Sequence, residues 1–143
     1  MDIPELLQPF ALASQTRFGE LTVEVAPGNL LEACRVLKHQ LGFERVSTIT
    51  AVDRYPLSPR FEVVYHLHSV KSRQRIRIKT RVDEDAELDS VTSVWRGANW
   101  YEREVFDLFG VRFANHPDLR RIMMPDDWTG HPLRKDYPVE GYK

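Results

Sequence analysis

The sequence predicts an α+β fold, in which a mixed or antiparallel sheet of about four strands has flanking helices and is followed by a Pro-rich irregular C-terminal arm. Apolar residues alternate with polar ones in several short segments, as in strands, and recur at helical spacing in two others. Residues 116–143 hold four prolines, which exclude a long helix or an inner strand. A chain of 143 residues fits one domain, so we expect a single α+β domain over residues 1–115 and an extended arm over residues 116–143.

The first elements of the chain are predicted to be a short helix and a strand. Asp2 is suited to cap a helix that runs to about Thr16, although Pro9 bends or shortens it. The alternation of apolar and polar side chains over residues 20–25 predicts a half-buried strand.

A second helix is predicted between an N-cap at Asn29 and a stop at Gly42, with Glu32 completing a capping box. Its apolar positions at helical spacing are Leu30, Cys34, Leu37 and Leu41. Three strands follow, over residues 44–53, 61–69 and about 73–82, and the turn residues between the first two predict an antiparallel hairpin.

The last predicted helix begins after Asn99 and stops at Gly110. Its apolar arc consists of Tyr101, Val105, Phe106, Leu108 and Phe109. Glu102 falls inside this arc, where it either completes a capping box, which we favour, or is desolvated and paired with an arginine. Arg103 and Asp107 lie on the opposite face, as an exposed ion pair or as a contact with another segment or subunit.

The C-terminal arm, residues 116–143, has the composition of an interface and not of a disordered tail. Its large apolar and aromatic residues are Leu119, Ile122, Met123, Met124, Trp128, Leu133, Tyr137 and Tyr142, interspersed with Arg120, Arg121 and Arg134. We therefore expect this arm to pack on a partner subunit.

Composition excludes several classes of function. Twenty basic against 21 acidic residues give a net charge of −1, so no overall field favours nucleic acid, and no apolar run is long enough to span a membrane. Cys34 is the single cysteine, which excludes an internal disulfide and a multi-thiolate zinc or iron–sulfur site and suggests a reducing compartment. The glycines are scattered, so binding of NAD, flavin or a nucleotide is unsupported.

Basic residues occupy every odd position from 71 to 81: Lys71, Arg73, Arg75, Arg77, Lys79 and Arg81. This strand face either meets phosphate, anionic lipid or an acidic partner, or is a solvated outer face neutralised by the acidic residues at 83–89. We favour the second interpretation.

Polar residues of the arm invite a metal or acid–base hypothesis: His116, Asp118, Asp126, Asp127, His131 and Asp136. Metal ligands need a rigid scaffold, whereas Asp and His in Pro-rich turns usually cap backbone groups. We favour the capping role and expect no catalytic or metal-binding residue.

Four runs carry a resemblance to a known family: ANWYEREVFDLFG at 98–110, HPDLRRI at 116–122, MPDDW at 124–128 and GHPLRKDYP at 130–138. They closely resemble the C subunit of proton-translocating NADH-quinone oxidoreductase, respiratory complex I, in its short stand-alone form. DRYP at 53–56 and RFEVVYHL at 60–67 are also similar to the family's hairpin. Asn115 departs from the family's usual glycine, but asparagine tolerates a positive φ there. The residues that the resemblance marks as signature and partner-interface candidates are Glu102, Arg103, Glu104, Asp107, His116, Pro117, Asp118, Arg120, Arg121, Met124, Pro125, Asp126, Trp128, His131, Pro132, Arg134, Asp136 and Tyr137.

The resemblance implies a non-catalytic structural subunit of the hydrophilic peripheral arm, supporting electron transfer from NADH to quinone coupled to proton translocation. It implies that this chain binds no cofactor, that FMN and iron–sulfur clusters reside in other subunits, and that the main partner is the large quinone-site subunit (the D subunit). The implied location is peripheral, on the cytoplasmic side of the inner or plasma membrane. Two alternatives stay open: the equivalent subunit of a membrane-bound hydrogenase or related dehydrogenase, and a hydrolase that uses His116 or His131 with a nearby aspartate.

Overall fold

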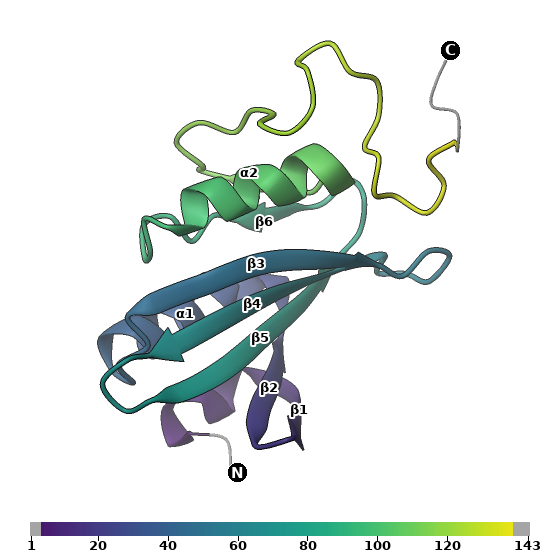
Figure 1. Cartoon of the computed structure of the whole chain (residues 1–143). Coiled ribbons are helices and arrows are strands. Elements are labelled where there is room, and N and C mark those ends of the chain that lie inside the picture. Colours follow the sequence, from purple (N-terminus) through teal and green to yellow (C-terminus); the bar gives the residue numbers. More distant parts are fainter. Residues whose placement is uncertain (1–3, 139–143) are drawn as a thin grey trace.

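The computed structural model describes residues 4–138 and confirms the predicted α+β class (Figure 1). Its main sheet has five strands in the order β1-β2-β5-β4-β3, one more than expected. Because β2 and β5 are parallel while the other pairs are antiparallel, the sheet is mixed. The strands are β1 (Ala11–Arg17), β2 (Glu20–Val25), β3 (Arg45–Asp53), β4 (Phe61–Ser69) and β5 (Gln74–Val82).

The predicted N-terminal helix is wrong over the described residues. A short 3-10 helix, η1 (Glu5–Phe10), is followed directly by strand β1. Phe18 and Gly19 both have positive φ, 52° and 77°, which is the conformation of a two-residue hairpin turn, and β1 pairs with β2 through it. Cross-strand pairing therefore overrides the helical tendency of residues 11–16, and the proposed cap at Asp2 lies outside the described residues.

Helix α1 (Leu30–His39) confirms the second predicted helix and covers one face of the sheet. Asn29 occupies the N-cap position, but its side chain makes no capping hydrogen bond and Glu32 instead pairs with Arg35. The capping box is absent because the preceding 3-10 turn, η2 (Pro27–Asn29), already bonds the Asn29 nitrogen to the Ala26 carbonyl and leaves Asn29 with a helical backbone.

The hairpin of β3 and β4 is confirmed, and its inward residues form the centre of the core. Tyr65 is fully buried, with Ile49 and Ile78 as its neighbours on the two adjacent strands. A parallel two-stranded sheet, β6 (Glu87–Asp89) and β7 (Arg112–Ala114), was not predicted. Strands of three residues are too short to show a period in the sequence.

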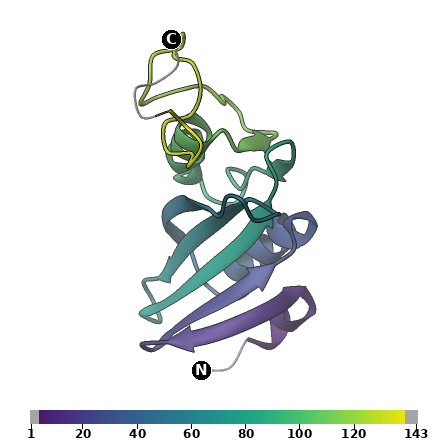
Figure 2. The same cartoon turned by 90° about the vertical axis from the view of Figure 1, so that its right-hand side faces the viewer.

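Helix α2 (Ala98–Phe109) packs beside β3. The first part of residues 116–138 runs along the side of α2 away from the sheet, and the last part descends past the C-terminal end of α2 to the end of the sheet at Asp53 and Arg60 (Figure 1, Figure 2). It begins after Gly97, earlier than the predicted cap at Asn99, and ends at Gly110 as predicted, where φ is 82°. Asn115 has a φ of 64°, so the positive φ expected at this turn is present. No helix of residues 4–138 covers the sheet face opposite α1.

Candidate functional site

The candidate site is the layer formed by α2 and residues 116–138, which we call the arm layer. At its centre lies Asp107, whose side chain is fully buried. Its Oδ2 atom accepts hydrogen bonds from the backbone nitrogens of Ile122, Met123 and Met124 at 3.0, 2.6 and 2.9 Å, and its Oδ1 atom lies 3.4 Å from Nη1 of Arg121. One carboxylate of α2 therefore holds a whole turn of the arm.

Arg103 and Asp107 do not form the exposed ion pair that their spacing allows. Arg103 Nε donates to the carbonyl of Arg120 at 3.4 Å, and its guanidinium lies 5.9 Å from the Trp100 ring centre. The interpretation that this helix face contacts another segment is confirmed, and that segment is the arm of the same chain.

Glu102 points into the core and bridges α2 to the preceding loop. Its carboxylate accepts hydrogen bonds from Ser90 Oγ at 2.6 Å and from the Val91 nitrogen at 2.8 Å, and it lies 3.9 Å from His116 Nε2. Burial raises its pKa to about 7, partly offset by these two hydrogen bonds. The predicted capping box is wrong, and so is the arginine partner.

The cap is unnecessary because a turn before α2 already bonds its first nitrogens. Ala98 donates to the Trp95 carbonyl and Asn99 to the Arg96 carbonyl. Glu102 is consequently free to turn inward within the apolar arc, where the loop before α2 supplies its donors.

Both histidines of the arm bond to backbone groups. His116 accepts from the Asp118 nitrogen at Nδ1, at 2.9 Å, which leaves Nε2 to donate to the Asn99 carbonyl at 3.2 Å. His131 Nδ1 lies 2.9 Å from the Asp107 carbonyl, and burial lowers the pKa of this imidazole. The favoured capping role is therefore confirmed for the two histidines, whereas the carboxylates of Asp118 and Asp136 pair with arginines.

The hydrolase hypothesis finds no support in this geometry. Asp118 offers its backbone nitrogen to His116, while its carboxylate pairs with Arg120 at 3.0 Å on the surface. Among residues 4–138, no three His, Cys, Asp or Glu side chains come close enough together to hold a metal ion.

The arm also closes the C-terminal end of α2. Leu133 donates its backbone nitrogen to the Leu108 carbonyl at 3.0 Å, and Arg134 Nε donates to the Phe109 carbonyl at 2.6 Å. A Cβ on Gly110 would lie 2.5 Å from Arg134 Nη2 and 2.7 Å from the His131 ring. Gly110 is therefore required both for its positive φ and for the close approach of the arm.

A buried arginine, Arg60, fastens the far end of the arm. It forms a bidentate pair with Asp53, with distances of 2.8 and 2.7 Å, and contacts Asp136 at 2.7 Å and Glu84 at 3.0 Å. Asp53 in turn accepts the Lys135 nitrogen at 2.8 Å. The hydrogen bond from Arg60 is the main cause that lowers the pKa of Asp53, and the same holds for Asp136.

Sequence reasoning missed Arg60 and Asp53 as arm contacts, although both lie in runs that carry the resemblance. The only indication in the sequence was that an arginine and an aspartate flank one hairpin turn, where they can form a bidentate ion pair. The two partners are joined by the hairpin, but the arm reaches them across 76 and 82 positions of sequence, which no local pattern encodes.

The solvent-exposed surface of the arm layer, which we call its outward side, includes large apolar side chains. Trp100, Met123, Trp128 and Leu133 are 53%, 55%, 42% and 52% exposed. The remaining candidates that lie at the surface are Pro117, Asp118, Arg120, Pro125, Asp126 and Asp136, while Arg103, Glu104, His116, Arg121, Met124, His131, Pro132, Arg134 and Tyr137 are half-buried. Exposed tryptophan and methionine beside arginine are typical of a protein interface.

Comparison with known proteins identifies the class. Residues 23–143 match the family model described as "Respiratory-chain NADH dehydrogenase, 30 Kd subunit". The C subunit of NADH-quinone oxidoreductase from Geobacter sulfurreducens is 54% identical over 125 residues, covering 86% of this chain and 77% of that protein. The mitochondrial 30.4 kDa subunit of NADH-ubiquinone oxidoreductase from Neurospora crassa is 48% identical over 98% of this chain and 49% of its own length.

A solved structure shares the fold. It is a chain from the "membrane-bound sulfane sulfur reductase (MBS), an archaeal respiratory membrane complex", with a TM-score of 0.80 and 31% identity over 92% of this chain and 79% of that one. The protein is thus a subunit of a membrane-associated, multisubunit respiratory complex. It belongs to the family of the respiratory-chain NADH dehydrogenase 30 kDa subunit, that is, the C subunit of NADH-quinone oxidoreductase. Within the described residues, no helix combines the length and the apolar character that crossing a membrane requires.

Proposed function

We propose that this chain is a non-catalytic structural subunit of the peripheral arm of proton-translocating NADH-quinone oxidoreductase. In this role it binds the large quinone-site subunit through the outward side of the arm layer. FMN and the iron–sulfur clusters reside in other subunits, and the chain lies on the cytoplasmic side of the membrane. Electron transfer from NADH to quinone and its coupling to proton translocation occur in the rest of the complex.

The observation that carries this proposal is the division of the arm layer into two sides. Three of its buried or half-buried titratable side chains are engaged within the chain: Asp107 holds three backbone nitrogens, Glu102 holds two donors, and His116 bonds through both ring nitrogens. Large apolar side chains, Trp128 and Met123 among them, have about half of their surface exposed. Such a layer is suited to association, because uncovered aromatic and Met surface gains most from burial.

The second candidate function is the equivalent subunit of a membrane-bound hydrogenase or related dehydrogenase complex. The match to a chain of the MBS complex supports this candidate. The MBS chain shares 31% identity with this chain, whereas the Geobacter sulfurreducens protein shares 54%. The greater identity favours NADH-quinone oxidoreductase.

Photo-cross-linking in the assembled complex tests the partner. Benzoylphenylalanine at position 123 should form an adduct with the quinone-site subunit, because Met123 is exposed on the outward side of the arm layer. The same group at position 18 is the control, since Phe18 is 96% exposed at the turn between β1 and β2. The proposal is contradicted if position 123 forms no adduct with the quinone-site subunit although a native gel shows that the complex is intact.

Purification of the chain alone tests the non-catalytic role. It should show no NADH or quinone oxidoreductase activity and no flavin or iron–sulfur absorbance. A stoichiometric visible spectrum that survives gel filtration would contradict this expectation.

A further inference from the structure

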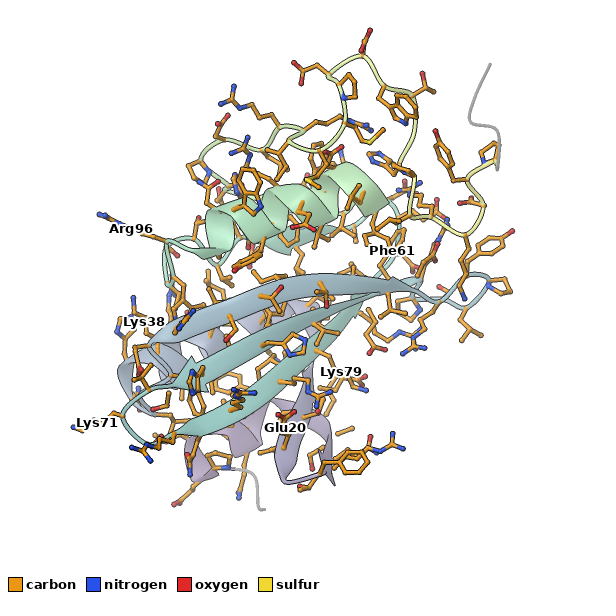
Figure 3. The ribbon with its side chains drawn as sticks, viewed as in Figure 1. Glu20, Lys38, Phe61, Lys71, Lys79 and Arg96 are labelled. Carbon is orange, nitrogen blue, oxygen red and sulfur yellow. The ribbon has the colours of Figure 1, made fainter. Side chains whose placement is uncertain are left out.

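The sheet face opposite α1 carries a row of cations across three strands. On β5 the buried residues alternate with Arg75, Arg77 and Lys79, which therefore point to this face. The register places His68 between Arg75 and Arg45, and His66 beside Arg77. Figure 3 shows Lys79 and Glu20 on the side of the sheet turned toward the viewer.

All of these side chains except that of Lys79 line a groove of about 380 Å³. Its polar walls include Arg45, His66, His68, Arg75, Arg77 and Glu20. Its floor is the strands themselves at Leu67 and Ile76, whose side chains are buried in the core on the other face. A second depression of about 160 Å³ adjoins it, shares Arg77 and extends the positive lining to Lys79 and Arg17. We call these two neighbouring depressions, whose linings also include the acidic residues Glu20 and Glu62, the basic groove.

The positive charge of the basic groove is only partly matched within the described residues. Glu20 pairs with Arg77, whereas the side chains of Arg45 and Arg75 form no hydrogen bond or ion pair with residues 4–138. Burial is the main cause that lowers the pKa of His66, and the neighbouring Arg77 charge acts in the same direction.

The acidic run at 83–89 does not neutralise this face, so that part of the favoured sequence interpretation is wrong. Asp83 accepts from Ser58 and from the Arg60 nitrogen, and Glu84 pairs with Arg60. Residues 87–89 form β6 beside β7. The chain turns away after β5, and the carboxylates of Asp83 and Glu84 contact the β3–β4 hairpin and Arg134 of the arm.

We propose that the basic groove docks an extended acidic segment of another subunit of the complex, with carboxylates seated against Arg45, Arg75 and His68. The ion pairs that the chain leaves unmade would then be completed across the interface. A membrane surface fits less well, because the groove has no exposed large apolar side chain to insert between lipids. Nucleic acid is disfavoured, since no Phe, Tyr or Trp ring lines the groove to stack on bases.

This inference rests on membership in the complex and concerns a face different from the arm layer. The experiment uses the assembled complex, with benzoylphenylalanine at Ser47, an exposed residue that lines the basic groove and carries no charge. The complex with benzoylphenylalanine at position 47 is prepared in three forms: with no other change, with Arg75→Glu and with Arg96→Glu. Arg96 is the matched control, because it is an exposed arginine that projects from the loop before α2, away from the groove (Figure 3).

The expected adduct joins position 47 to a peptide in which Asp and Glu outnumber Lys and Arg. Its yield should fall by about fivefold or more in Arg75→Glu, because like charges repel across an interface, and should be unchanged in Arg96→Glu. An adduct with lipid only, with a peptide lacking acidic excess, or no adduct at all would overturn the inference, as would equal losses in both variants. The adduct between position 123 and the quinone-site subunit tests the arm-layer interface separately. Failure of one proposal can therefore be distinguished from failure of the other.

Discussion

The Oδ2 atom of Asp107 lies 2.6 Å from the backbone nitrogen of Met123, in the middle of three consecutive nitrogens that share this acceptor. A helix side chain thereby supplies the hydrogen bonds that Pro-rich backbone cannot make with itself. This contact explains how residues without helix or strand structure follow a defined path along α2. It also places Met123 with its side chain turned outward, 55% exposed.

Replacing Asp107 with alanine should destabilise the arm strongly. The change leaves three backbone donors and the Arg121 guanidinium without their acceptor, which we expect to cost about 3–5 kcal/mol. Amide hydrogen exchange should show loss of protection at residues 122–124 before the β-sheet loses any. Asp118→Ala is the control, since its exposed pair with Arg120 is worth less than about 1 kcal/mol. Equal protection in the two variants would show that Asp107 does not hold the arm.

Replacing the two partners of the ion pair between Arg60 and Asp136 should cost very different amounts of stability. Arg60→Ala strands the buried Asp53 carboxylate and should lower the free energy of unfolding by about 3–5 kcal/mol. Asp136→Ala removes a partner whose side chain is 45% exposed and should cost less than about 1 kcal/mol, while loosening residues 134–138. Urea unfolding of both variants measures this difference, and similar losses for the two would contradict the assigned burial.

Glu102 should make the chain less stable as the pH rises from about 5 to 7. Its folded-state pKa of about 7 exceeds the ordinary value of 4.5, so the folded chain holds a proton that the unfolded chain releases in this range. The loss amounts to at most about 3 kcal/mol. Glu102→Gln keeps an acceptor for Ser90 and Val91 but cannot ionise. The fall in unfolding free energy that Glu102 contributes should therefore be absent from this variant, and a slope equal to that of the wild type would exclude Glu102 as the cause.

Arg103 tests the contribution of the arm layer to assembly. Its hydrogen bond to the Arg120 carbonyl is long and exposed, so Arg103→Ala should change the melting temperature of the chain little. We expect the same variant to be retained less well in the membrane-bound complex, because the charge lies beside the exposed Trp100 ring. Wild-type amounts of assembled enzyme in this variant would show that Arg103 is an ordinary solvated residue with no role in assembly.

The sequence predicted those parts of the fold in which local pattern and tertiary structure agree. Helices α1 and α2 and strands β2, β4 and β5 each carry a clear period, and Gly42 and Gly110 both have a positive φ. Strand β3 was also predicted, although an irregularity between Val46 and Thr48 interrupts its alternation. Strand β1 was missed because nearly all of its residues are exposed, which leaves no alternation to detect. The turn at Phe18 and Gly19 was the one local signal for it.

The site was predicted by residue type but not by contact. The apolar arc correctly located Glu102 on the inward face of α2. Its hydrogen bond with Ser90 could not be predicted, because it depends on the path of the loop that precedes α2. Asp107 was correctly assigned a contact beyond its own helix, but spacing along one helix cannot say which segment approaches it. Long-range pairs such as Arg60 with Asp136 are set by tertiary packing and have no local signature.

The most direct test of the proposed interface is to remove large side chains from the outward side of the arm layer and to measure how much of the chain is retained in the complex. Trp100→Ala combined with Trp128→Ala removes two half-exposed rings that make none of the bonds holding the arm to α2. We predict a folded chain with an unchanged circular dichroism spectrum, a severalfold loss of chain from affinity-purified complex and a matching loss of NADH–quinone reductase activity. Phe18→Ala, at the exposed turn of the β1–β2 hairpin, should retain both. Normal retention of the double tryptophan variant, with full quinone reductase activity, would contradict the claim that this surface joins the chain to its partner.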